Sequence, residues 1–454
     1  MNPSASPKRS DHTLRFAALG ALVLCFVLPG SPVKAYSVLS HEALIDAAWD
    51  PFIVPLLLSR YPGATPDQLL QAHAFAYGGC VIQDLGYYPF GNHYFSDLTH
   101  YVRTGDFIEA LLADSRDIDE YAFALGALSH YVADNTGHPL AVNISVPEMY
   151  PGLRQKFGNR VTYEDNPTAH VMTEFSFDVV QITGAGYLPM TYHNFLGFEV
   201  PQGLLDRAFQ DTYGLKLHRQ FLSEGLSLWS YRLTASEIIP DIGQILWRKK
   251  AKHLHRVDPQ IATARFRYRL STQNYRTLAR RRRRFYRLRP WAWQWKSRAK
   301  EANVQFVAKV LVFFVEVAPK VGPLRTLEFK PPTVQVQDQF IRAFDVTVSR
   351  FESDLVQLRK GGAPAFPEAN LDTGGATKAG NYALADETYA RLLHTLARQH
   401  FRGLTPELRK DILSYYAMPD VPAVATKHPK KWRKTLRELA ALRAAPIQSQ
   451  IASH

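Results

Sequence analysis

Between residues 36 and 200, apolar side chains recur at helical spacing and predict a succession of helices. Thr65 can cap a helix whose first residue is Pro66, and apolar residues then follow at intervals of three or four. Residues 118–134 are rich in alanine and leucine, and only Gly126 interrupts them. No alternating pattern of more than a few residues indicates a strand in this part of the chain. We therefore expect an all-α fold.

Caps or apolar spacing predict further helices along the chain. They run from Ser40 to Asp46, Phe95 to Tyr101, Ala169 to Val180 after a cap at Asn166, Val304 to Val317, and Thr405 to about Met418. The run from Val304 to Val317 has 14 residues and carries charges, so it predicts a buried helix rather than a membrane span. The glycine pairs at 361–362 and 374–375 mark loops.

The first 35 residues have the pattern of a signal peptide. A basic stretch precedes an apolar run from Phe16 to Leu28, and small residues follow up to Ala35. An uncleaved membrane anchor is the alternative, but 13 apolar residues are too few to cross a bilayer. Cleavage after Ala35 would make Tyr36 the first residue of a periplasmic or extracellular protein.

Cysteine is scarce, which bears on how an exported chain would be stabilised. The chain has two cysteines, and removal of a signal peptide would take Cys25 and leave Cys80 alone. The mature protein would then have no internal disulfide. Another kind of cross-link, such as a bound metal, would have to connect its helices.

Charge divides the chain into an acidic and a basic part. The net charge is +13, yet residues 36–200 hold about three times as many acidic as basic side chains. The excess of lysine and arginine lies after residue 200. From composition and helical character we predict three regions: a signal peptide at 1–35, a helical domain at 36–245, and a basic, mostly helical region at 246–454.

The strongest basic cluster runs from Arg280 to Trp295, where five consecutive arginines precede three tryptophans at alternate positions. This composition suits the surface of an anionic membrane, because arginine attracts the headgroups and indole favours the interface. It also suits single-stranded nucleic acid, although we consider that partner second. The third interpretation is that the cluster docks on the acidic part of the same chain. No obligate protein partner is evident.

Candidate chemistry lies in the acidic part, where histidines and carboxylates recur four residues apart. His130, Asp134 and His138 share one helical face, and His170 and Glu174 share another. Imidazole and carboxylate groups are the ligands of hydrolytic zinc sites. One such pair is often a salt bridge or an accident of composition, but two pairs and a third histidine in step favour a metal site.

The acidic excess itself favours bound cations. Clustered carboxylates raise one another's pKa unless cations lie among them. A solvated surface accounts for some of these acids, such as Asp114, Asp117, Asp119 and Glu120. It does not account for carboxylates placed beside histidines.

These motifs resemble the zinc-dependent phospholipases C, which are related to the fungal single-strand-specific zinc nucleases. The resemblance rests on Tyr36 to His41 at the expected mature N-terminus, Asp84, His100, the run from His130 to His138, and the pair His170 and Glu174. It covers residues 36 to about 180 and implies an all-helical domain with a trinuclear zinc site.

The resemblance also implies which residues bind each ion. One zinc would be bound by Asp84, His100, His130 and Asp134; a second by His138, His170 and Glu174; and a third by His41, a bridging Asp134, and the amino nitrogen and carbonyl oxygen of Tyr36.

Three positions depart from the family pattern. Tyr36 stands where the family usually has tryptophan, which still permits binding because the backbone supplies the ligands. His93 is an alternative to His100, whose spacing from Asp84 is closer to that of the family. The gap between His130 and His138 is shorter than in some members, which could shift the helix end that carries His138.

The expected activity is hydrolysis of phosphodiesters, with phospholipid as the first substrate. In the family, zinc ions activate a water for attack on phosphorus, and the residue at the position of Asp84 is proposed as general base. A nuclease is the alternative enzyme, favoured by the basic region and the short spacing from Tyr36 to His41, whereas Glu174 favours the lipase. A non-catalytic, zinc-stabilised surface-binding protein is the alternative outside enzymes.

Overall fold

A computed structural model describes residues 38–184, 197–257, 259, 330–362, 364–417 and 429–446. The expected signal peptide, Tyr36, the basic cluster Arg280–Trp295 and the expected helix Val304–Val317 lie outside these ranges.

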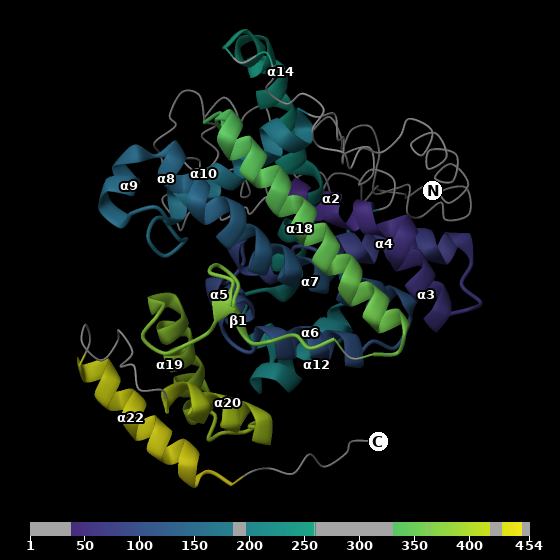
Figure 1. Ribbon diagram of the computed structural model, residues 1–454. Coiled ribbons are helices and arrows are strands. Elements are labelled where there is room, and N and C mark those ends of the chain that lie inside the picture. The colour runs from purple at the N-terminus through teal and green to yellow at the C-terminus, as the bar shows by residue number, and fades with distance from the viewer. Residues whose placement is uncertain are drawn as a thin grey trace, which may run out of the picture.

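Helices make up most of the described structure, which has almost no strand, and this confirms the all-α prediction (Figure 1). The α-helices are α2 (Val38–Ala48), α3 (Val54–Arg60), α4 (Pro66–Gly79), α5 (His93–Tyr101), α6 (Thr104–Ala113), α7 (Ile118–Gly137), α8 (Asn143–Met149), α9 (Pro151–Phe157), α10 (Pro167–Phe177), α12 (Gln202–Tyr213), α13 (Glu224–Leu233), α14 (Ile239–Val257), α18 (Val334–Arg359), α19 (Ala383–Arg398), α20 (Pro406–Tyr416) and α22 (Pro429–Ala444).

Short 3₁₀ and π segments complete the helical part. They are Trp49–Ile53, Ile82–Tyr87, His138–Val142, Asp178–Thr183, Leu217–Arg219 and Thr234–Ile238. In the described ranges, the only strands are β1 (Ala369–Asn370) and β2 (Gly375–Ala376), which pair antiparallel with Asn370 opposite Gly375. No helix in these ranges is long and apolar enough to cross a membrane.

Predicted caps begin several of these helices. The Thr65 side chain accepts a hydrogen bond from the Gln68 amide, and the Gln68 side chain accepts one from the Thr65 amide. This capping box satisfies two amides that would otherwise have no helical partner. Asn166 and Thr405 cap α10 and α20 in the predicted places.

Helix α7 is the centre of the fold. Every side chain from Tyr121 to Asp134 is buried, because α2, α3, α4, α6 and α18 all pack against it. A helix that is enclosed on all sides has no solvent-facing stripe. Polar groups on α7 therefore need partners inside the protein.

Glycines allow α4 and α7 to approach closely. A Cβ on Gly126 would lie 2.2 Å from the carbonyl oxygen of Ala76, and a Cβ on Gly79 would lie 2.1 Å from that of Phe123. Gly126 is thus required for close packing, although glycine disfavours a helix. The crossing lies one turn before His130.

The chain after residue 330 packs on the same core. Helix α18 crosses α7 (Figure 1), and Nη1 of Arg350 donates a hydrogen bond of 3.0 Å to the Thr136 hydroxyl. Helix α19 packs against α5, and α22 packs against α19. The domain boundary at residue 245 stays a prediction, but elements from both sides of it share one core.

The glycine crossing can be tested by adding a single methyl group. Gly126→Ala should lower the free energy of unfolding by about 1–3 kcal/mol, because the new Cβ must displace the α4 backbone. Thermal unfolding followed by circular dichroism measures the change. Gly225→Ala is the matched control, since nothing lies within 4 Å of a Cβ at that helical position. Equal melting temperatures for the two variants would contradict this account of the crossing.

Candidate metal centre

Five separate elements bring histidines and carboxylates to one buried place beside α7. Helix α7 carries His130 and Asp134, and its π-helical continuation begins at His138. The other contributions are His41 from α2, Asp84 from the 3₁₀ turn, His100 from the last turn of α5, and His170 and Glu174 from α10. Each of these residues is at most 5% exposed.

The end of α7 keeps His138 in step with the rest of its face. The His138 amide donates to the carbonyl of Asp134, so the helical path continues without a break into the π turn. His130, Asp134 and His138 thus follow one another along one side of the helix. The short gap between His130 and His138 does not divert the chain.

Backbone carbonyls fix the orientation of three of the imidazoles. Nδ1 of His100 lies 2.7 Å from the Ser96 carbonyl, and Nδ1 of His130 lies 3.1 Å from the Cys80 carbonyl. Nδ1 of His138 is 3.1 Å from the Leu371 carbonyl. A carbonyl only accepts, so each Nδ1 must carry the proton. Each Nε2 then presents a lone pair, as a metal ligand requires.

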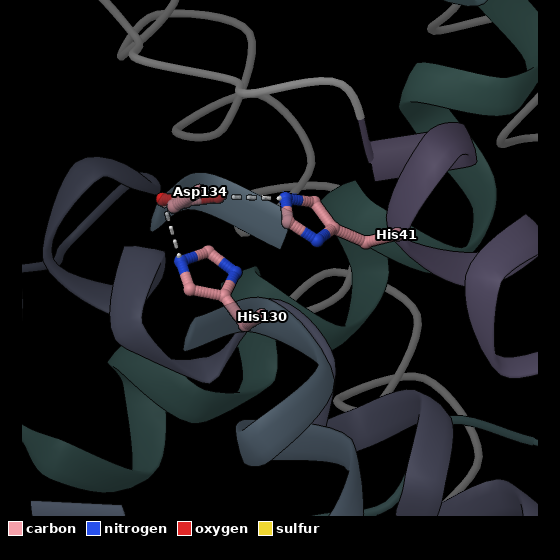
Figure 2. A group of neighbouring side chains, drawn as sticks. All are labelled: His41, His130 and Asp134. Carbon is pink, nitrogen blue, oxygen red and sulfur yellow. Dashed lines mark ion pairs between the residues drawn. The ribbon is translucent and has the colours of Figure 1, made fainter. Parts of the chain in front are cut away.

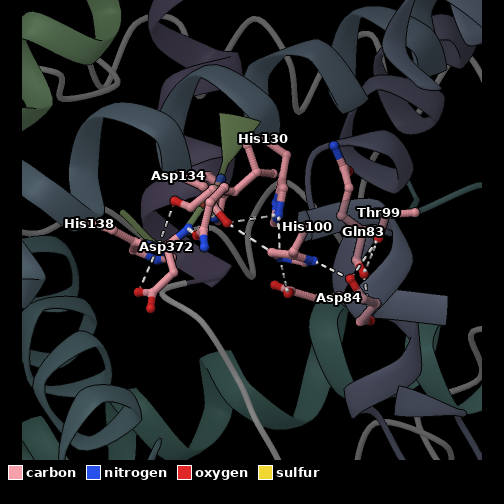
Figure 3. Close-up of polar contacts among 12 residues, drawn as sticks. Gln83, Asp84, Thr99, His100, His130, Asp134, His138 and Asp372 are labelled. Carbon is pink, nitrogen blue, oxygen red and sulfur yellow. Dashed lines mark hydrogen bonds and ion pairs between the residues drawn. The ribbon is translucent and has the colours of Figure 1, made fainter. Parts of the chain in front are cut away.

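The first group consists of Asp84, His100 and His130 (Figure 3). The Nε2 atoms of the two histidines lie 3.5 Å apart, and Nε2 of His100 lies 3.4 Å from Oδ1 of Asp84. Two lone pairs that face each other at this distance repel unless a cation lies between them. The Nε2 atoms of His100 and His130 must therefore share a proton or a metal ion.

The second group consists of His41, His130 and Asp134 (Figure 2). The two imidazole rings stack with centroids 4.5 Å apart. Nε2 of His41 lies 3.4 Å from Oδ1 of Asp134, and Nε2 of His130 lies 3.2 Å from Oδ2. Asp134 also lies 3.4 Å from Nε2 of His100, so its carboxylate lies between the first two groups.

The third group consists of His138, His170 and Glu174. Oε1 of Glu174 lies 2.8 Å from Nε2 of His170 and 3.2 Å from Nε2 of His138. His170 and Glu174 are one turn apart on α10, which holds both at a fixed spacing.

The carboxylates have the unsatisfied oxygens expected of metal ligands. Oδ2 of Asp84, both oxygens of Asp134 and Oε1 of Glu174 are buried, and no group among the described residues donates a hydrogen bond to them. Burying such oxygens costs free energy unless a cation or donor compensates. Nitrogen and oxygen donors of this kind suit zinc. The residues therefore fit a divalent ion in each group.

Burial and neighbouring charges shift the pKa values in opposite directions. Burial lowers the pKa of His41 to about 4 and raises that of Glu174 to about 8. Burial would lower the pKa of His100 too, but the neighbouring carboxylates of Asp134 and Asp84 raise it to about 10. Burial opposes ionisation of Asp134, yet the neighbouring imidazoles of His130 and His138 hold its pKa well below the usual range. Protons thus occupy part of the metal-free centre at neutral pH.

The structure brings together every predicted ligand that it describes. Tyr36 is the exception, since it lies outside the described residues. His93, the alternative to His100, belongs to none of the three groups; its ring packs edge-on against Tyr87. The geometry therefore favours His100.

A small cavity of about 30 Å³ opens beside the metal groups. Its walls include Asp84, Asp134 and Glu174, together with the rings of Tyr87, Tyr101 and Tyr163. Tyr87 follows Asp84 closely in the sequence and lines this cavity, whereas Tyr88 packs edge-on against Tyr231 in the core.

Sequence reasoning missed Asp372, which also lines this cavity. It lies in the turn between β1 and β2, far along the chain from the other residues. Its Oδ1 lies 3.6 Å from Nδ1 of His138 and 3.9 Å from Nε2 of His170. The sequence around Asp372 indicates only a glycine-containing loop, so no spacing rule connects it with the histidines.

The helical fold and these three groups define a class of protein: an all-α protein with a candidate multinuclear metal centre. A family model described as zinc dependent phospholipase C matches residues 40–223. The matched residues, which are less than half of the chain, resemble that family. A search of curated proteins and a search of solved structures each found no match.

Removal of the shared carboxylate should empty the centre. Asp134→Asn is expected to lose most bound zinc, because the neutral amide cannot offset the charge of ions in adjacent groups. Metal content after gel filtration measures the loss. His73→Gln is the control, since His73 is also buried and lies 3.1 Å from a carboxylate, that of Asp46, but outside the three groups. Full zinc content in the Asp134 variant would contradict the assignment.

Zinc binding should also release protons. Near pH 7 the metal-free protein carries a proton on His100, whose pKa is about 10, and one on most copies of Glu174, whose pKa is about 8. Both must leave before these groups bind a cation, so about two protons should be released per chain. Calorimetric titration of the metal-free protein in buffers of different ionisation enthalpy measures this number. Zinc affinity should fall as pH falls, and a heat independent of buffer would refute the expectation.

Proposed function

We propose that the protein is a zinc-dependent phosphoric diester hydrolase of phospholipase C type, and that it binds three zinc ions. The observation that carries the proposal is the set of three metal-capable groups beside one cavity, two of which share His130. The resemblance of residues 40–223 to the zinc dependent phospholipase C family supports it.

The chemistry follows from what each residue can do. Bound zinc would polarise the phosphoryl oxygens and make an attacking water more acidic. Asp84 lines the cavity, and its Oδ2 accepts no hydrogen bond in the described structure, so it is placed to accept the proton of that water. Burial raises the pKa of Tyr87 and Tyr101 well above the ordinary value. Both phenols therefore stay protonated, as hydrogen-bond donors.

Export would complete the third metal group in this proposal. Cleavage after Ala35 would place a new amino group at Tyr36, which in the sequence is two residues before α2 and five residues before His41. The start of α2 is fixed, because Asp178 accepts hydrogen bonds from the amides of Leu39 and Ser40. Tyr36 would then bind zinc through its backbone. We propose a periplasmic or extracellular location on this ground.

The substrate is proposed to be a phospholipid presented on an anionic surface. The segment Arg280–Trp295 supplies the charge and the indoles for such a surface. Among the described helices, α22 adds exposed lysine and arginine side chains at the edge of the molecule (Figure 1).

Parallel assays on phosphatidylcholine, phosphatidylinositol and single-stranded DNA test this function. We expect release of a phosphorylated headgroup from a phospholipid, loss of that activity with a chelator, and recovery with zinc. Activity on vesicles should rise with anionic lipid and fall with salt, because screening weakens surface attraction.

Other outcomes would overturn the proposal. Faster cleavage of DNA than of either lipid would identify a nuclease of the related family. Zinc binding without hydrolysis of any phosphodiester would identify a binding protein. His130→Ala is the inactive control, since it removes a ligand shared by two groups.

A further inference from the structure

The hairpin at residues 369–376, here called the strap, lies outside the family-matched segment and touches the metal centre directly. The Leu371 amide donates to the His100 carbonyl at 3.0 Å, and the Leu371 carbonyl accepts from Nδ1 of His138 at 3.1 Å. The strap thus links a residue of the first group with one of the third.

Several contacts fix the position of the strap. The Thr104 hydroxyl donates to the Ala369 carbonyl and accepts from the Ala369 amide, each at 3.0 Å. The Asn143 side chain donates to the Asp372 carbonyl at 2.6 Å. Gly374 has a φ of +69°, and a Cβ there would lie 2.6 Å from the carbonyl oxygen of Asn135, the residue after Asp134. Only glycine permits this close approach to α7.

The two oxygens of the Asp372 carboxylate differ in their hydrogen-bond partners. Oδ2 accepts a hydrogen bond of 2.9 Å from the Tyr163 amide and another from the Tyr382 hydroxyl. Oδ1 is buried and accepts no hydrogen bond from the described residues. It lies within 4 Å of His138 (Figure 3) and also within 4 Å of His170. The two donors hold the side chain so that Oδ1 is directed at the third group.

We propose that Asp372 is a positioning residue for the divalent ion bound by His138, His170 and Glu174. Imidazoles that share a dication become more positive, and a fixed carboxylate beside them stabilises that charge. The Leu371 carbonyl selects the tautomer of His138 in which Nδ1 carries the proton. Oδ1 of Asp372 places a negative charge beside the imidazoles of His138 and His170. This inference rests on the metal binding of the proposed function, and it makes residues beyond the family-matched segment part of the centre.

Asp372→Asn tests the charge with little change of shape. The amide oxygen can replace Oδ2 as acceptor for Tyr163 and Tyr382, while the amide nitrogen takes the place of Oδ1. We expect zinc affinity at one subsite to fall about 10- to 100-fold, with the other ions unaffected. Competition with a chromophoric chelator measures affinity and stoichiometry, and the visible spectrum of the Co²⁺-loaded protein reports the altered subsite.

Asp386→Asn is the matched control. Asp386 is also a buried carboxylate of the later part of the chain that accepts a hydrogen bond from a tyrosine hydroxyl, that of Tyr415, but it is absent from the cavity. The substitution Asp386→Asn should therefore leave zinc affinity unchanged.

The outcomes separate this inference from the proposed function. Equal zinc affinity and spectrum in Asp372→Asn and in the unaltered protein would overturn it. If Asp372→Asn does not fold, Tyr382→Phe provides the test. This variant keeps the charge of Asp372 but removes one of the two hydrogen bonds that orient it, so zinc affinity at the same subsite should fall by a smaller factor. Unchanged zinc affinity would refute the positioning role of Asp372. If the unaltered protein itself binds no zinc, the metal centre and the proposed function fail together.

Discussion

The structure depends on one electrostatic constraint, the burial of Asp134 among imidazoles whose lone pairs face one another. Oδ2 of Asp134 lies 3.2 Å from Nε2 of His130 and 3.4 Å from Nε2 of His100. Bulk solvent offers little compensation for this charge, since Asp134 and His130 are fully buried. Cations placed among them turn an unfavourable cluster into a cross-link between helices. Bound zinc would thereby connect the helices, as disulfides do in many proteins.

The close packing of helices also orients a residue of this cluster, His130. Gly126 and Gly79 bring α4 against α7, and the Cys80 carbonyl at the end of α4 then accepts the Nδ1 proton of His130. The same close crossing that tightens the core therefore selects the tautomer of a candidate ligand. Backbone carbonyls perform this role for three histidines, so side-chain substitution at the acceptor positions would not remove it.

Sequence patterns predicted most of this centre because its parts are local. His130 and Asp134, like His170 and Glu174, lie one helical turn apart, and Thr65 and Asn166 begin helices where their chemistry indicates. The resemblance supplied the isolated Asp84 and His100, which no local spacing connects. The sequence did not predict Asp372, because this residue comes close to His138 only in the folded chain. The sequence of the strap that carries it indicates a turn and nothing more. Tyr36 and the cluster Arg280–Trp295 stay predictions.

The contacts of the strap change how the basic part of the chain is interpreted. Net charge alone suggested a region that meets an acidic partner, yet two of its residues contact candidate ligands through hydrogen bonds or charge. Leu371 joins His100 to His138, and Asp372 adds a carboxylate to the third group. Because α18 also packs along α7, loss of this region would expose apolar surface of the central helix as well as the metal centre. The later region therefore packs on the core and, in the role proposed for Asp372, supports the metal centre.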